Sequence, residues 1–188
     1  MTINTKTLFD PSLEKDNCGF GLIAQRNGKR SRKLVKKSIL GLTSMTHRGA
    51  IGADGKTGDG CGLLFDLNHS FFKLKVGGEL DVELPDFFAV AQLFHKNDID
   101  FYYSSIRKFL NSQDLDIAVT RSVPVNNEVL GKIARQNLPN ISQVFITSKN
   151  TNLNKERFEA CLLQARKFIE EKFDNDEEFY VCSMSTQT

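Results

Sequence analysis

The hydrophobic pattern is most regular in the second half of the chain, from Phe87 onward. Short apolar runs predict strands, and apolar residues spaced three or four positions apart predict helices. The expected strands are Phe87–Phe94, Asp116–Arg121, Ser142–Thr147 and Glu178–Met184, and the expected helices are Ile99–Leu110, Asn127–Gln136 and Asn154–Phe173. Strands and helices in this order predict a mixed α+β domain.

The first part of the chain differs, because glycines stand inside an apolar run. Cys18–Ala24 follows a charged lead-in and contains two glycines among apolar residues, which favours a buried strand that begins at the cysteine. Asn27-Gly28 is a strong turn signal. Ser31 is placed to cap a helix over Arg32–Thr46. The apolar face of that helix carries Val35, Ile39, Leu42 and Met45.

A glycine-rich loop follows this helix. We expect the helix to stop at His47–Ala50, with Gly49 as a left-handed C-terminal cap. Asp54–Gly62 then contains four glycines in nine residues, a density typical of tight turns with close backbone approach. The loop matches neither the Walker phosphate loop nor the dinucleotide-binding glycine pattern. The simplest interpretation is a hairpin corner from which Gly62–Phe65 returns as a strand.

Length and charge narrow the class of protein. The 188 residues suit one domain with a sizeable core. A net charge of +2 gives no signal for nucleic acid or a membrane surface as a partner, and we interpret the basic run Lys29–Lys37 as a solvated helix face rather than a phosphate site. No apolar segment approaches the roughly 18 residues of a membrane span. Met1–Asn17 lacks the apolar centre of a secretory signal, so we expect a cytoplasmic protein.

Cysteine and histidine are too dispersed to predict a metal site. The cysteines are Cys18, Cys61, Cys161 and Cys182. They form no C-x-x-C pair, which argues against a zinc site and against a dense disulfide framework. The histidines are His47, His69 and His95, and no two of them have metal-ligand spacing. We place His69 in a surface turn and His95 at the end of a strand.

Cys18 has two interpretations. One is a small packing residue in the core, since free cysteines are commonly buried. The other is a nucleophile, which needs a base because a thiol with a pKa near 8.5 is mostly protonated at neutral pH. A nucleophile that begins a mature chain has such a base in its own α-amino group, whose pKa is about 7.7–8.0. This chemistry requires removal of residues 1–17, because an amide nitrogen cannot accept the proton.

Three motifs stand at separations that point to a family. They are Leu13–Ala24, Met45–Ala50 and Ala53–Leu64. Together with later segments through Phe179–Met184, they closely resemble the beginning of the glutamate synthase large subunits over nearly the whole chain. The resemblance implies a class II glutamine amidotransferase domain with the N-terminal-nucleophile fold, in which two sheets lie between helix layers (α/β/β/α). Residues 1–17 would be a leader, and residues 18–188 the N-terminal, incomplete portion of that domain.

The resemblance also implies a site and a reaction. It makes Cys18 the catalytic nucleophile and Arg48 a substrate-binding residue, with His47 and Gly49 as supporting neighbours. The thiol would attack the side-chain amide of glutamine, release ammonia and leave a thioester that water hydrolyses to glutamate. The ammonia would pass to a region of the full-length protein that carries FMN and an iron–sulfur cluster and aminates 2-oxoglutarate. A small electron-transfer subunit or ferredoxin is the implied partner, and no cofactor or metal is expected in this chain.

Two family elements lie outside these 188 residues. They are an Arg-Phe-Ser-Thr segment that grips glutamine and an Asn-Gly pair that forms the oxyanion hole, both of which follow the Phe179–Met184 strand in the family. Losing one oxyanion donor costs about 3 kcal/mol of barrier, so we expect this chain alone to have negligible glutaminase activity. Two alternatives stay open: a stand-alone, non-catalytic module that binds a partner through the Lys-rich helix or a sheet edge, and a class II amidotransferase with another ammonia acceptor.

Overall fold

The computed structural model describes residues 19–46, 49–150 and 153–188, which divide between two units. The first unit ends at Leu63, and the second comprises Leu64–Thr188. In the described residues, the first unit holds one α-helix and a glycine-rich loop, and the second holds a sheet with its covering helices. The mixed α+β class predicted from the sequence is confirmed.

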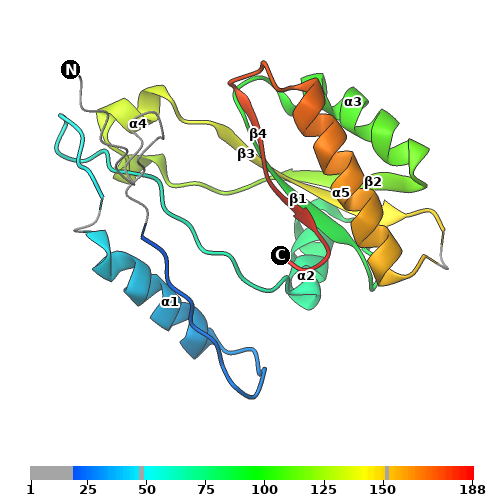
Figure 1. The fold of residues 1–188 in the computed structure, drawn as a ribbon, viewed down its shortest axis with the longest axis horizontal. Coiled ribbons are helices and arrows are strands. Elements are labelled where there is room, and N and C mark those ends of the chain that lie inside the picture. The colour runs from blue at the N-terminus through cyan, green and yellow to red at the C-terminus, as the bar shows by residue number, and fades with distance from the viewer. Residues whose placement is uncertain (1–18, 47–48, 151–152) are drawn as a thin grey trace, which may run out of the picture. The chain divides into compact units, whose positions relative to one another are not determined.

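The second unit is built on a four-stranded antiparallel sheet with the strand order β2-β3-β1-β4 (Figure 1). The strands are β1 (Ala89–His95), β2 (Leu115–Ser122), β3 (Asn140–Ser148) and β4 (Phe179–Ser185). All four match predicted strands. β1, which lies between β3 and β4, is the most continuously buried of the four, with five of its seven residues buried.

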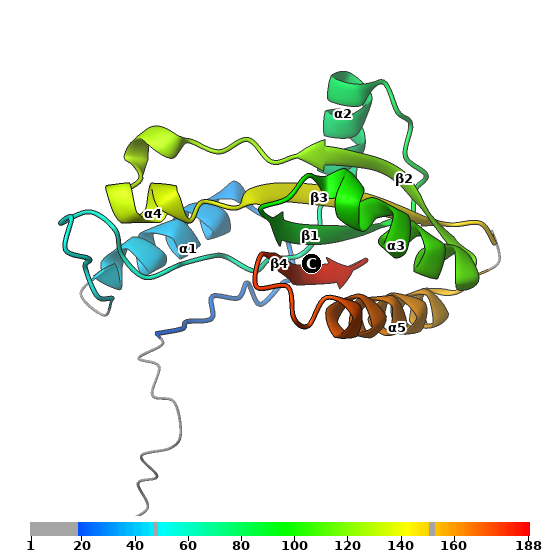
Figure 2. The ribbon, with the colours of Figure 1, turned by 90° about the horizontal axis from the view of Figure 1, so that it is seen from above.

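Helices α3 (Ile99–Ser112) and α5 (Lys155–Lys172) cover one face of the sheet (Figures 1 and 2). Both match predicted helices. Each turns a stripe of apolar side chains toward the strands. The buried residues of the stripes are Tyr102, Ile106 and Leu110 on α3, and Phe158, Leu162, Ala165 and Ile169 on α5. They pack on alternate strand residues such as Ala91, Leu93 and Val144, and this layer is the main core.

Helix α2 (His69–Leu80) is missing from the sequence-based prediction. Asn68 begins it by accepting the N–H of Phe71 on its side-chain oxygen. The helix contains Gly77-Gly78 and no single apolar stripe, so neither propensity nor periodicity favours it in sequence. A second core around it covers part of the other sheet face, through Leu67, Val76, Leu84, Phe88, Val90 and Phe145.

The predicted surface turn at His69 is therefore wrong. His69 is the first residue of α2 and is half-buried. Its Nε2 lies 3.2 Å from the carbonyl oxygen of Phe88. Its ring packs edge-on against the Phe88 ring, with the two ring centroids 4.7 Å apart. The imidazole thus joins the start of α2 to the residue that precedes β1.

Between β2 and β3 the chain leaves the sheet (Figure 2). The sequence predicts one helix over Asn127–Gln136, but the structure has a 3-10 turn, η2 (Asn127–Val129), followed by helix α4 (Lys132–Gln136). Leu130 and Gly131 between them are extended, with ψ of 146° and 164°. A glycine loses more backbone entropy in a helix than other residues do, so the break falls beside Gly131.

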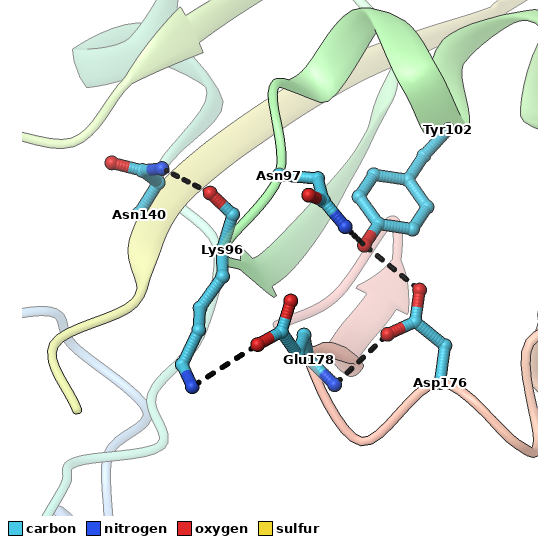
Figure 3. A network of polar contacts seen from close by, with 6 residues as sticks. All are labelled: Lys96, Asn97, Tyr102, Asn140, Asp176 and Glu178. Carbon is cyan, nitrogen blue, oxygen red and sulfur yellow. Dashed lines mark hydrogen bonds and ion pairs between the residues drawn. The ribbon is translucent and has the colours of Figure 1, made fainter.

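A polar network joins the start of α3 to the start of β4 (Figure 3). The buried Tyr102 donates its hydroxyl to Asp176 Oδ2 at 2.9 Å and accepts from Asn97 Nδ2 at 3.3 Å. Burial raises the pKa of Tyr102, and the carboxylates of Asp176 and Glu178 raise it further. The phenol therefore stays protonated as a donor. Lys96 adds a second link through a 3.3 Å ion pair with Glu178.

In the first unit, helix α1 (Arg32–Ser44) confirms the predicted helix. Ser31 caps it as expected, because its Oγ accepts the N–H of Leu34 at 3.1 Å. The turn at Asn27-Gly28 is also confirmed: Gly28 has a φ of +64° and its N–H donates to Gln25 O at 2.9 Å. None of the α1 residues is buried, and Val35 and Ile39 on its apolar face are 41% and 50% exposed.

The two strands predicted for the first 65 residues are wrong. Residues 19–24 form no strand, and Phe20 and Leu22 are 92% and 91% exposed. Residues 62–65 also form no strand. A strand needs a neighbour to pair its backbone groups. In the described part of the first unit, the only strand-like backbone pairing is the isolated bridge between Ile51 and Gly58.

The predicted left-handed cap at Gly49 is wrong as well. Helix α1 ends at Ser44, and its cap is Met45, which has a φ of −89°. The Met45 N–H donates to the carbonyls of the last helical turn, so the helix closes without a glycine. Among the glycines that the structure describes, Gly28 and Gly55 have positive φ.

Asp116 on β2 supplies a pH-dependent part of the stability. Burial raises its pKa, but the hydrogen bonds from Arg107 and from the Ile117 N–H, with the charges of Arg107 and Lys149, hold it below its usual value. A carboxyl with a lowered folded pKa stabilises the fold above the unfolded pKa of about 3.9 and loses this contribution as the pH falls through the folded pKa.

We therefore expect Arg107→Gln to reduce the free energy of unfolding at pH 7, with the difference from the wild type shrinking toward zero as the pH falls through the folded pKa of Asp116. Urea unfolding at pH 7, 5 and 3 measures this. A difference that grew on acidification would contradict the assignment.

Candidate functional site

The residues predicted for the site fall at the beginning of the chain and just after α1. Cys18, His47 and Arg48 lie outside the described residues. Gly49 is described, and its N–H donates to Thr46 O at 3.3 Å. The Thr46 hydroxyl in turn donates to a carbonyl oxygen of α1 at 2.6 Å. The described residues on either side of positions 47 and 48 are therefore bonded to each other, and Thr46 is also bonded to the last turn of α1.

A hairpin with a defined tip follows Gly49. Asp54 Oδ1 accepts the N–H groups of Lys56 and Thr57 at 3.1 and 2.8 Å, and Asp54 Oδ2 accepts the Thr57 hydroxyl at 2.7 Å. Gly55 sits at the tip with a φ of +68°, a conformation that side chains disfavour. Gly52 donates its N–H to Thr57 O at 2.6 Å, and a Cβ on Gly52 would meet that oxygen at 3.3 Å. The predicted hairpin corner is confirmed, and its glycines allow this close approach.

The base of the hairpin is closed by one carboxylate. Asp59 Oδ2 accepts the N–H of Ala50 at 2.9 Å, and Ile51 bridges Gly58 in antiparallel fashion just above it. A Cβ on Gly49 would lie 3.6 Å from the same Asp59 oxygen. The chain that follows position 48 is thus held against Asp59.

Two carboxylates fix the turns of a stretch that is otherwise basic. Asp54 and Asp59 are the acidic residues of positions 19–63, a stretch that otherwise carries lysines and arginines. Both carboxylates accept hydrogen bonds from the loop backbone. An ionised carboxylate is a strong acceptor for backbone N–H groups, so each fixes a turn that glycines alone would leave loose.

Asp59 has no assigned role in the sequence-based prediction, although it stands inside the Ala53–Leu64 motif. A signal for it exists: Asp59 is flanked by Gly58 and Gly60, and aspartate in a tight turn commonly accepts a nearby backbone N–H. Its partner Ala50 is nine residues earlier, which local turn rules do not predict. Only the folded hairpin identifies that partner.

His95, at the end of β1, is buried and fully bonded. Its Nδ1 lies 2.6 Å from the carbonyl oxygen of Asn97, which can only accept, so we assign the proton to Nδ1. Nε2 then accepts the hydroxyl of Ser142 at 2.8 Å. Both ring nitrogens are engaged, and His95 joins β1 to β3 instead of offering a base or a metal ligand.

The described residues contain neither a cluster of metal ligands nor a membrane-spanning helix. Across residues 19–46, 49–150 and 153–188, no three or more His, Cys, Asp or Glu side chains gather in a way that could hold a metal ion. The described cysteines, Cys61, Cys161 and Cys182, are free, and these residues do not fit an iron–sulfur cluster. No helix of the same ranges combines the length and apolar character needed to cross a bilayer.

Comparison with known proteins gives one family and several long relatives. The family model for "Glutamine amidotransferases class-II" matches residues 18–188. The chain is 36% identical, over 98% of its length, to a ferredoxin-dependent glutamate synthase from Pyropia yezoensis. It is 34% identical to the glutamate synthase (NADPH) large chain from Azospirillum brasilense over 99% of its length, and 32% identical to a glutamate synthase (NADH) from Saccharomyces cerevisiae over 96%. It spans 12%, 13% and 9% of those three proteins.

Proposed function

Because the chain belongs to the class II glutamine amidotransferases, we propose that it is the glutamine-hydrolysing part of a glutamate synthase large chain. The observation that supports this most directly is that the family match begins at Cys18, the residue that the sequence marks as a nucleophile. The relatives with an NADH, an NADPH or a ferredoxin designation are all glutamate synthases, which favours this acceptor over another one.

The proposed reaction uses Cys18 after residues 1–17 have been removed. The free α-amino group takes the thiol proton, and the sulfur forms a bond to the side-chain carbonyl carbon of glutamine. The tetrahedral intermediate collapses as the carbon–nitrogen bond breaks, and the departing nitrogen takes the proton and leaves as ammonia. Water then adds to the thioester, the carbon–sulfur bond breaks, and glutamate leaves with the thiol restored.

Within this proposal, Arg48 binds glutamine, and His47 and Gly49 support it. The described residues contribute the frame: Gly49 is bonded to Thr46, and Ala50 is bonded to Asp59. An arginine guanidinium is suited to hold a carboxylate with two parallel hydrogen bonds, which is what the α-carboxylate of glutamine offers.

We also propose the complete α/β/β/α sandwich for the whole domain. The support is the sheet face opposite α3 and α5, of which α2 covers only a part. Phe94 and Tyr180 stack on one another there with ring centroids 6.3 Å apart, and Tyr180 is 58% exposed. A second sheet packed on this face would bury these rings, as face-to-face sheets do.

The partners of the whole protein follow as proposals from its relatives. Ammonia would be used to aminate 2-oxoglutarate in a part of the longer protein that carries FMN and an iron–sulfur cluster. A small electron-transfer subunit or ferredoxin would supply electrons, in keeping with the relatives' differing designations. We keep the cytoplasm as the proposed location.

The test of this proposal is the N-terminus of the complete protein isolated from its host. Mass spectrometry is expected to find a chain that begins at Cys18. Cyanate near pH 7 should then carbamylate the α-amine ahead of the lysines, because its pKa is about 7.7–8.0 against about 10.4, and should abolish ammonia release from glutamine. Full glutaminase activity in a protein that still begins at Met1 would contradict the mechanism.

A further inference from the structure

A cavity of about 440 Å³ opens at one end of the sheet in the second unit. β1 and β2 end there and β3 begins there, because the antiparallel register places His95 opposite Asn140 and Ser122 opposite Ser142. All of the residues that line the cavity lie between His95 and Ser142, a range that the structure describes throughout. The volume is within the range of about 300–1,000 Å³ that is typical of small-molecule sites.

Two of the lining residues, His95 and Ser142, are polar and buried, each 3% exposed. The His95 Nδ1–H donates to Asn97 O at 2.6 Å, and Nε2 accepts the Ser142 hydroxyl at 2.8 Å. The imidazole is therefore neutral and has no further donor or acceptor to offer. The Ser142 hydroxyl donates its one proton to His95, so toward a ligand its oxygen can only accept.

Asn140 and Asp98 also line the cavity, and each has an oxygen that can accept a hydrogen bond. Asn140 donates Nδ2 to Lys96 O at 3.1 Å, and its Oδ1 points away from that bond (Figure 3). Asp98 caps α3 by accepting the Asp100 N–H on Oδ1 at 3.2 Å. Among the described residues, neither Asn140 Oδ1 nor the second oxygen of Asp98 has a hydrogen-bond partner. Both oxygens are therefore available to a ligand.

The charge of the lining selects for a cation. Asp98 is its one ionised residue, since His95 is neutral and the described lining contains no lysine or arginine. Asn127 and Ser122 also line the cavity, but an amide and a hydroxyl can both donate and accept, so they select no charge. The remaining walls are apolar, through Ile99, Val123, Val125, Leu138, Pro139 and Ile141. A ligand that fits combines a cationic hydrogen-bond donor with a hydrocarbon body.

We propose that this cavity binds a small primary amine in its protonated form. The ammonium group has three N–H donors for the acceptors on Ser142, Asn140 and Asp98, and its charge offsets that of the carboxylate. The hydrocarbon chain lies against the apolar walls and leaves water. A free amino acid or a nucleotide fits less well, because its carboxylate or phosphate meets no cationic residue in the described lining. This proposal does not depend on the glutaminase function.

Saturation-transfer difference NMR of the complete protein with n-pentylamine at pH 7 tests the proposal. Like the lysine side chain, whose pKa is about 10.4, this amine is protonated at that pH. We expect saturable binding with a Kd of about 1 mM or tighter. n-Pentanol, which has the same chain without the charge, should bind about 10-fold more weakly or less. Ammonium chloride, which has the charge without the chain, should compete only at about 10-fold higher concentration or more. No saturable binding of the amine, or equal binding of n-pentanol, would overturn the proposal.

Asp98→Asn is the informative variant, because asparagine caps a helix about as well as aspartate but carries no charge. We expect it to raise the Kd for n-pentylamine by about 10-fold or more. Asp100→Asn is the matched control, since it removes the same charge from the first turn of α3 at a residue that does not line the cavity. It should leave the Kd within about 2-fold of the wild type. An unchanged Kd in Asp98→Asn, or an equal loss in both variants, would contradict a site at Asp98.

Val125→Lys gives an independent check that leaves the cap of α3 intact. Val125 is 50% exposed on the cavity wall, so the fold tolerates a longer side chain there, and the new ammonium group competes for the same acceptors. We expect n-pentylamine binding to weaken by about 10-fold or more, with a thermal midpoint close to that of the wild type. Unchanged binding in this variant would show that the amine binds elsewhere, which also overturns the proposal.

Discussion

Replacing Cys18 by alanine in the complete protein is expected to reduce glutamine-dependent glutamate formation by on the order of 1,000-fold or more. Without the sulfur no thioester can form, and the α-amino group has no thiol proton to remove. The same variant supplied with ammonium chloride should keep its rate, because the later amination needs only ammonia. Steady-state rates with each nitrogen source measure the two outcomes separately.

The matched control for this prediction is Cys61→Ala. Cys61 is an exposed free cysteine in the same unit and within the glycine-rich motif, so the two variants remove the same chemical group. Cys61→Ala should retain glutaminase activity near the wild-type level. If Cys18→Ala stayed active while Cys61→Ala lost activity, the nucleophile would have been assigned to the wrong cysteine. A loss of both nitrogen-source activities in Cys18→Ala would indicate misfolding and would remove the support for a catalytic role.

Leu162→Ala is expected to lower the free energy of unfolding by about 2–5 kcal/mol. Leu162 lies on the inner stripe of α5 and is completely buried in the core against the sheet. Its replacement removes apolar contacts and leaves a cavity that the surrounding helices and strands fill only in part. With a slope of about 2 kcal/mol/M in urea, the unfolding midpoint should fall by about 1–2.5 M.

The neighbouring Leu163 provides the control for this prediction, because the same substitution there removes an exposed side chain. Leu163 is 55% exposed on the outer side of α5, and Leu→Ala hardly changes helix propensity. We expect Leu163→Ala to change the free energy of unfolding by no more than about 0.5 kcal/mol. Urea unfolding of the 188-residue chain, followed by circular dichroism, compares the two variants. Equal midpoints would show that α5 does not face the sheet in the way described.

The second unit was largely predictable because its elements follow simple periods. The apolar run before His95 and the three-and-four spacing of α5 are local patterns that correspond directly to burial against a neighbour. Helix α2 was not predictable, because Gly77-Gly78 and scattered apolar residues weaken both signals, and tertiary packing around Val76 decides the outcome. The break in the helix predicted over Asn127–Gln136 follows from Gly131, which costs more backbone entropy in a helix than other residues do.

The first unit shows where sequence patterns fail. The apolar run after Cys18 has the composition of a strand, but strand formation depends on a pairing partner that no local pattern specifies. Residues 19–24 have no such partner among the described residues of their unit. The hairpin at Asp54 was predictable as a corner, because glycine and aspartate carry turn chemistry locally. The hydrogen bond from the Ala50 N–H to Asp59 was not predictable, since it depends on how far the hairpin extends.

The sheet order also governs when this part of the protein can fold during synthesis. β1 pairs with β4, so that Val90 lies opposite Ser185, which is synthesised much later. At about 5–20 residues per second, several seconds or more pass between the emergence of β1 from the ribosome and the arrival of its second neighbour. During this interval β1 has at least one open edge, which is a template for mispairing with other nascent chains. Chaperone demand should therefore be greatest before β4 emerges, and it should fall once Ser185 has left the exit tunnel.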